Sequence, residues 1–147
     1  MKQSAGLLMF RRTAGGVEVL LVHPGGPFWR NKDAGAWTIP KGEPNPNEDL
    51  LARAKVEFEE ELGIQPNVRD LFELGSIKQK GGKIVHAWAF EDDLPSGFVV
   101  HSNMFQFHGQ SFPEVDRAQF FSIEQAREKI NPAQTAFLDR LSDALKA

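Results

Sequence analysis

Hydrophobic and polar positions alternate in short runs along the chain, and these runs predict β-strands. The segments "SAGLLMF" (4–10) and "VEVLLVH" (17–23) are rich in apolar residues and flank "RRTAGG", whose glycines suit a hairpin turn. Other strands are predicted at 70–79, 83–91, 103–108 and 118–122. The pattern thus favours a sheet assembled from several short strands.

Between these strands, apolar positions recur with the helical period. A central helix is predicted over 48–62, with Asn47 as its N-cap and Gly63 as its C-terminal stop. Ser122 and Gln125 have the spacing of a capping box, which predicts a helix from about 123. A last helix is predicted after Pro132, and the whole pattern predicts one α/β sandwich.

Composition narrows the classes of function. The chain has 147 residues, which suits a single domain over 1–147, and a formal net charge of -3 argues against binding of long nucleic acids. The absence of cysteine excludes disulfides, thiol catalysis and cysteine-ligated zinc, and is compatible with a cytoplasmic protein. No run approaches the roughly 18 apolar residues of a membrane span, so no membrane association is expected.

Acidic residues crowd onto one side of the predicted central helix. Glu57, Glu60 and Glu61 stand at i, i+3 and i+4, beside the apolar stripe that holds Phe58 and Leu62. Like charges at these spacings repel, so a cation that neutralises them would stabilise the helix. Mg²⁺ prefers such carboxylate oxygens together with phosphate oxygens. The alternative interpretation is a solvated acidic face without a ligand.

The spacing of the residues around this helix resembles the signature of the Nudix hydrolase family. Gly42, Glu48, Glu57, Phe58, Glu60, Glu61, Gly63 and Ile64 occupy matching positions. Val56 departs from the signature because the family has arginine there. The flanking segment "AWTIPKGE" is similar to the branch that acts on diadenosine polyphosphates and related nucleotide or inositol polyphosphates. The resemblance implies a Nudix-type α/β/α sandwich with a mixed central sheet.

The resemblance also implies metal-assisted hydrolysis of a pyrophosphate bond in a nucleoside diphosphate-linked substrate, such as a nucleoside triphosphate or dinucleoside polyphosphate. Glu57, Glu60 and Glu61 would hold Mg²⁺ or Mn²⁺, joined by the backbone carbonyl of Lys41. Either Glu60 or Glu61 is expected to accept the proton of the attacking water. Glu114 is a candidate metal ligand or base from a later loop, with a solvent-facing acid as the alternative.

Substrate contacts are expected from several other side chains. Lys41 and Arg30 are candidates to bind phosphate oxygens. Trp37 is a candidate to stack on a nucleobase, as are Phe28 and Trp29, although core packing is the favoured interpretation for Trp37.

The missing signature arginine leaves a second class of function open, a ligand-sensing or interaction domain without turnover. Arg53 lies four residues before Glu57 and seven before Glu60, so we expect it to take over part of the orienting task. The sequence does not distinguish a monomer from a homodimer.

Overall fold

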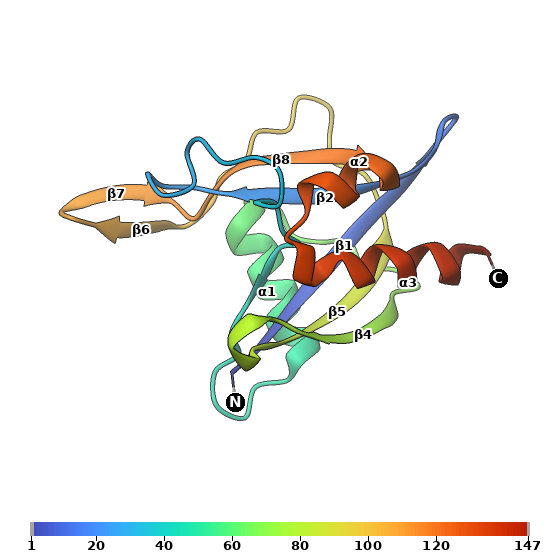
Figure 1. Cartoon of the computed structure of the whole chain (residues 1–147), viewed down its shortest axis with the longest axis horizontal. Coiled ribbons are helices and arrows are strands. Elements are labelled where there is room, and N and C mark those ends of the chain that lie inside the picture. Colours follow the sequence, from blue (N-terminus) through green and yellow to red (C-terminus); the bar gives the residue numbers. More distant parts are fainter. Residues whose placement is uncertain (1, 147) are drawn as a thin grey trace.

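The computed structural model describes residues 2–146 and is organised around one mixed β-sheet (Figure 1). Its strands are β1 (Gln3–Thr13), β2 (Gly16–Pro24), β3 (Lys41–Gly42), β4 (Phe72–Lys78), β5 (Ile84–Glu91) and β8 (Val115–Ser122). The order across the sheet is β4-β5-β1-β2-β8, and β3 pairs with β1. Strand β1 is parallel to β5 but antiparallel to β2 and β3, which makes the sheet mixed.

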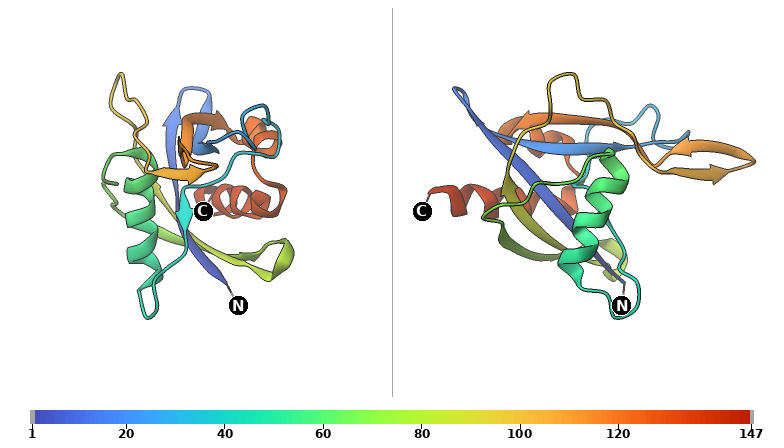
Figure 2. Two further views of the ribbon diagram at one scale, coloured as in Figure 1. Left: turned by 90° about the vertical axis from the view of Figure 1, so that its left-hand side faces the viewer. Right: turned by 180° about the vertical axis from the view of Figure 1, so that it is seen from behind.

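Helices cover both faces of this sheet. Figure 2 shows α1 (Leu50–Leu62) on one face, with α2 (Ile123–Lys129) and α3 (Thr135–Lys146) on the other. This arrangement confirms the expected sandwich with a mixed central sheet. Within residues 2–146, no helix is both long enough and apolar enough to cross a membrane.

Strand β1 joins the two hydrophobic cores because its alternate side chains enter opposite layers. Leu7 and Met9 pack in the core that contains Phe58 of α1. Leu8 and Phe10 pack in the core that α2 and α3 cover. A strand buried on both faces is almost continuously apolar, which explains the run "GLLMF" in this strand.

The predicted strands are found with small shifts at their ends, but two strands were not predicted. Strand β3 has only two residues, too few for a periodic pattern in the sequence. It forms because Gly6 of β1 leaves room for the backbone of β3. A Cβ atom on Gly6 would lie 2.5 Å from the carbonyl oxygen of Pro40. Strand β7 (Gln110–Pro113) pairs only with β6 (Met104–Phe107), as a ribbon that projects from the sheet (Figure 1).

The central helix begins two residues later than the sequence predicts. Asp49 is its N-cap, with a carboxylate that accepts a hydrogen bond from the backbone N–H of Ala52 at 3.0 Å. Asn47 has φ of 64° and belongs to the preceding turn, so its prediction as N-cap is wrong. The helix ends at Gly63 as predicted, where a positive φ of 84° suits glycine.

We expect replacement of the N-cap by alanine to destabilise the protein. Asp49→Ala removes the acceptor for the Ala52 N–H and should lower the free energy of unfolding by about 1 kcal/mol. Asp49→Asn is the matched control, since its side-chain oxygen still accepts and should retain most of that stability. Chemical denaturation of both variants measures the difference, and equal losses in the two would show that Asp49 does not act as a cap.

Candidate active site

The carboxylates of α1 meet the turn that precedes the helix at Gly42. A Cβ atom at this glycine would lie 2.1 Å from the side-chain Cδ of Glu57, so only glycine lets this carboxylate approach the backbone so closely. Pairing of β3 with β1 fixes the position of Gly42 in turn. The glycine of the signature is therefore a packing requirement of Glu57.

Glu61 is the most buried carboxylate of the group, with 9% of its surface exposed. The pKa of Glu61 is raised to about 8, mainly by burial and then by the negative charges of Glu57 and Glu114. The charge and the backbone of Lys41 oppose this rise. The structure thus brings Lys41 and Glu61 together, as the sequence predicts.

Lys41 itself is partly enclosed beside the carboxylates. Burial is the main cause that lowers the pKa of Lys41 below its ordinary value, and the positive charge of Lys83 lowers it further. The charges of Glu61, Glu43 and Glu57 act in the opposite direction. The Lys41 side chain therefore belongs to the same electrostatic group as the acidic residues.

Glu114 joins this group from the junction between β7 and β8. Partial burial raises the pKa of Glu114, and so do the charges of Glu57 and Glu60. The backbone fixes its position, since the Glu114 N–H donates to the Asn103 carbonyl at 2.8 Å and the Asn103 N–H donates to the Glu60 carbonyl at 2.9 Å. The structure places Glu114 beside the α1 carboxylates, where the sequence analysis expected an additional acid.

Arg53 binds the carboxylates together. Its guanidinium donates to Glu48 at 2.7 and 3.0 Å and to Glu57 at 2.8 Å, and it lies 3.9 Å from Glu60. The hydrogen bonds to Glu48 are the largest cause that raises the pKa of Arg53, and those to Glu57 follow. The expected contacts of Arg53 with Glu57 and Glu60 are confirmed, and Glu57 is the closer partner.

Two of the expected substrate-binding residues lie elsewhere. Trp37 is only 1% exposed and packs edge-to-face on Phe121, with its indole N–H donating to Asp33 at 2.8 Å. This core position argues against the expected role of Trp37 in substrate binding, because neither ring face is open to a ligand. Arg30 is exposed in the loop between β2 and β3.

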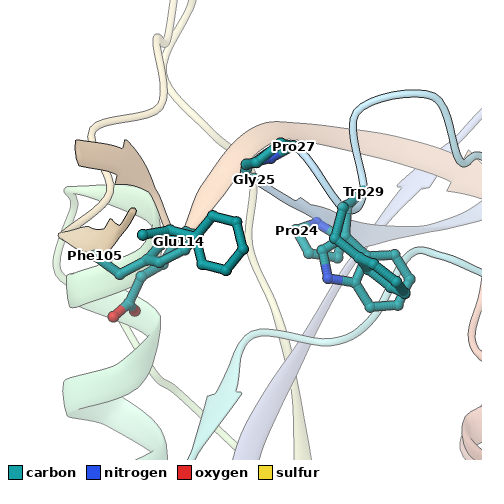
Figure 3. A pocket seen from close by; sticks show the side chains of 9 residues that line it. Pro24, Gly25, Pro27, Trp29, Phe105 and Glu114 are labelled. Carbon is teal, nitrogen blue, oxygen red and sulfur yellow. The ribbon is translucent and has the colours of Figure 1, made fainter. Parts of the chain in front are cut away.

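That loop forms one wall of an apolar cleft beside Glu114. The cleft encloses about 480 Å³ and is lined by Pro24, Gly25, Gly26, Pro27, Phe28, Trp29, Phe105, Phe107 and Glu114. Figure 3 shows Trp29 and Pro24 on one side of it and Phe105 with Glu114 on the other. Phe105 and Phe107 were not predicted as site residues, because the segment 103–108 shows only an alternating strand pattern in the sequence.

A buried histidine fastens the wall to strand β8. The Nδ1 atom of His23 lies 2.8 Å from a carboxylate oxygen of Asp116, and its Nε2 atom lies 2.6 Å from the carbonyl oxygen of Lys32. The two ring nitrogens thus connect the loop carbonyl to the carboxylate on β8. Asp116 thus holds the loop in place rather than facing the α1 carboxylates.

The arrangement suits a hard divalent cation. Within the described part of the chain, no three His, Asp or Glu side chains already stand in a closed metal-binding geometry. Glu57 is instead turned toward Arg53. However, Glu57, Glu60, Glu61 and Glu114 raise one another's energy through like charge, and the Lys41 backbone adjoins Glu61. Such oxygen donors are the ligand type that Mg²⁺ and Mn²⁺ prefer.

The family model of the NUDIX domain matches residues 1–141 of the chain. The chain belongs to the Nudix family. Membership of this family supports a pyrophosphohydrolase, an enzyme that hydrolyses pyrophosphate bonds. No curated protein sequence matches the chain significantly.

Solved structures share the Nudix fold over the full length of the chain. An Ap4A hydrolase from C. elegans in a binary complex superimposes with a TM-score of 0.70 at 24% identity, over 99% of this chain and 98% of its own. The NUDIX domain of Shewanella oneidensis NrtR, complexed with ADP ribose, gives 0.68 at 12% identity, over 99% and 88%. The MutT protein from Methanosarcina mazei gives 0.65 at 22% identity, over 99% and 96%.

Neutralising Glu61 should stabilise the metal-free protein in a pH-dependent way. Because the folded-state pKa of Glu61 is raised from 4.5 to about 8, its ionisation costs stability progressively as pH rises through this interval. Glu61→Gln should raise the free energy of unfolding by roughly 2–4 kcal/mol at pH 9 and by little at pH 4. Denaturation in chelator at both pH values measures this, and a gain independent of pH would contradict the electrostatic cause.

Removal of Arg53 should lower turnover more than it lowers stability. Without the guanidinium, Glu57 loses its orientation, so Arg53→Ala should reduce kcat by roughly 10- to 100-fold with a smaller change in KM. We expect Arg53→Lys to retain part of the activity, and Val56→Arg to restore part of it in the Arg53→Ala background. A kcat equal to that of the parent enzyme would show that Arg53 does not position the carboxylates.

Proposed function

We propose that this enzyme hydrolyses a pyrophosphate bond in a nucleoside diphosphate-linked substrate, of the nucleoside triphosphate or dinucleoside polyphosphate type, with Mg²⁺ or Mn²⁺. One observation carries the proposal: a group of mutually repelling carboxylates lies at the end of an aromatic cleft, and Glu114 belongs to both. The similarity in fold to an Ap4A hydrolase and to an ADP ribose complex supports a nucleotide-type substrate.

In this proposal the carboxylates of Glu57, Glu60, Glu61 and Glu114 and the carbonyl of Lys41 hold the cation. A bound divalent cation neutralises the charge of the pyrophosphate and makes a coordinated water more acidic. Glu60 or Glu61 accepts the proton of the attacking water, whose oxygen forms a bond to phosphorus while the bridging P–O bond breaks. The ammonium of Lys41 then lies near the released phosphate oxygens.

The second candidate function is that of a ligand-sensing or interaction domain that binds a nucleotide without turning it over. Val56 in place of the signature arginine favours it, since a residue outside the signature, Arg53, then forms the ion pairs with Glu57 and Glu60. Retention of all signature glutamates favours the enzyme.

A substrate panel with isosteric variants tests the proposed reaction. Nucleoside triphosphates, diadenosine polyphosphates and ADP-ribose are incubated with Mg²⁺ or Mn²⁺ in ¹⁸O-labelled water, and the products are identified by mass spectrometry. Glu60→Gln and Glu61→Gln should each lower kcat by roughly 100-fold or more on the best substrate. Glu59→Gln is the matched control, because Glu59 is exposed on the other side of α1 and should leave activity unchanged.

Three outcomes would contradict the proposal. Undiminished hydrolysis in excess chelator would show that the reaction does not need a divalent cation. Equal activity of all three glutamine variants would show that Glu60 and Glu61 do not take part in the reaction. Tight binding of a nucleotide without release of any labelled product would support the sensing domain instead.

A further inference from the structure

The apolar cleft has two aromatic walls of different origin. Phe28 and Trp29 belong to the loop after β2, whereas Phe105 and Phe107 belong to the projecting β6–β7 ribbon. Phe28 is 65% exposed and Phe107 is 46% exposed, which is unusual for large apolar side chains. The volume of about 480 Å³ lies in the range of small-ligand sites.

The backbone sets the two walls close together. A Cβ atom on Gly26 would lie 2.7 Å from the Phe105 ring, and one on Gly25 would lie 2.0 Å from the carbonyl oxygen of Pro113. The Gly25 N–H donates to the Glu114 carbonyl at 2.9 Å. Because these contacts require glycine, the two glycines of "PGGP" allow the loop to pack closely against the ribbon.

The exposed ring of Phe28 is held in a defined orientation. Phe28 packs edge-to-face on Trp29, with 4.9 Å between ring centroids. The ammonium of Lys32 lies 3.5 Å from the centre of the Phe28 ring. A ring fixed in this way loses little conformational entropy when a flat ligand stacks on it.

The side chains of the cleft offer few groups that could recognise a particular base by hydrogen bonds. Among its lining side chains only the Trp29 indole and the Glu114 carboxylate are polar. Pro24 and Pro27 have no backbone N–H, and that of Gly25 is already used within the protein. Specific reading of a base edge depends on such donors and acceptors, whereas stacking depends only on a flat aromatic ring.

The acidic group fixes which end of a ligand enters the cleft. The Glu114 carboxylate lies at the cleft and points toward α1 (Figure 3), where the charges of Glu57 and Glu60 act on it. A cation bound by these carboxylates would attract the phosphates of a ligand to that end. The aromatic end is then left for an uncharged planar group.

We propose that this cleft stacks the nucleobase of the substrate between the loop and the β6–β7 ribbon, and that it requires an aromatic base without selecting its identity. The inference rests on the proposed function, because it places the phosphates of the same substrate at the α1 carboxylates. The enzyme therefore acts on a class of nucleotides that share their phosphate chain and differ in their base.

Binding of matched non-hydrolysable ligands tests the inference apart from catalysis. Isothermal titration with Mg²⁺ compares α,β-methylene-ADP with the corresponding GDP and CDP analogues and with base-free methylenebisphosphonate. The nucleotide analogues should bind within roughly 10-fold of one another, and methylenebisphosphonate should bind roughly 5- to 150-fold more weakly. A strong preference for one base, or equal affinity for the base-free ligand, would overturn the inference.

Variants assign the binding to the cleft. Phe28→Leu and Phe107→Leu keep an apolar side chain but remove the aromatic face. Each should therefore weaken binding of the nucleotide analogues roughly 5-fold or more and leave binding of methylenebisphosphonate unchanged. Phe28→Tyr keeps the aromatic ring and should therefore bind the nucleotide analogues as tightly as the parent protein. Val99→Ala is the matched control, because Val99 is 66% exposed and does not line the cleft. Unchanged nucleotide affinity in both leucine variants would overturn the inference.

Steady-state kinetics and the molar mass in solution distinguish failure of the stacking cleft from failure of the proposed function. If nucleoside triphosphates and inorganic tripolyphosphate are hydrolysed with equal kcat/KM, the proposed function stands and the stacking cleft fails. If the binding pattern holds but no substrate is cleaved, the stacking cleft stands and the proposed function fails. A dimer in light scattering that Phe28→Leu or Phe107→Leu dissociates would show that a second copy of the chain covers the cleft, against the inference.

Discussion

Repulsion among the carboxylates at α1 is the constraint around which the site is built. Burial, followed by the charges of Glu57 and Glu114, raises the pKa of Glu61 to about 8, so ionising this carboxyl in the folded protein without a cation is unfavourable. Arg53 offsets part of the repulsion through its bonds to Glu48 and Glu57. A fold that tolerates this repulsion must be stabilised elsewhere, and the two apolar cores on either side of β1 supply that stability.

The same architecture explains why the acidic group and the aromatic cleft adjoin. Strand β2 leads into the loop with Phe28 and Trp29, and its neighbour β8 follows the ribbon with Phe105 and Phe107. Hydrogen bonds from Gly25 to Glu114, and from Glu114 through Asn103 to the Glu60 backbone, continue from the cleft to α1. The aromatic walls and the carboxylates are therefore positioned by one connected piece of backbone.

The sequence predicted the features that depend on local periodicity and spacing. The sandwich, the acidic face of α1 and the stop at Gly63 follow from patterns within about 20 residues. The N-cap was placed at Asn47 because several capping residues occur together, and only the backbone conformation distinguishes Asp49. The cleft could not be predicted, since its walls lie about 80 residues apart in the chain and meet only after β2 and β8 pair. By residue type alone, Trp37 and Trp29 are equal candidates for stacking on a base, and only tertiary packing shows that Trp37 is buried.

The position of Arg53 shows why a missing signature residue does not by itself indicate an inactive protein. At about 100° per residue, position 53 lies about 40° from Glu57 and about 20° from Glu60 around the helix. Position 56 lies about 100° and about 40° from them, so position 53 faces both carboxylates more directly around the axis, whereas position 56 is about 4.5 Å nearer to Glu60 along it. Val56 instead lines a surface pocket together with Leu51 and Val68. The electrostatic requirement is a cation near Glu57 and Glu60, and either position on the helix can meet it.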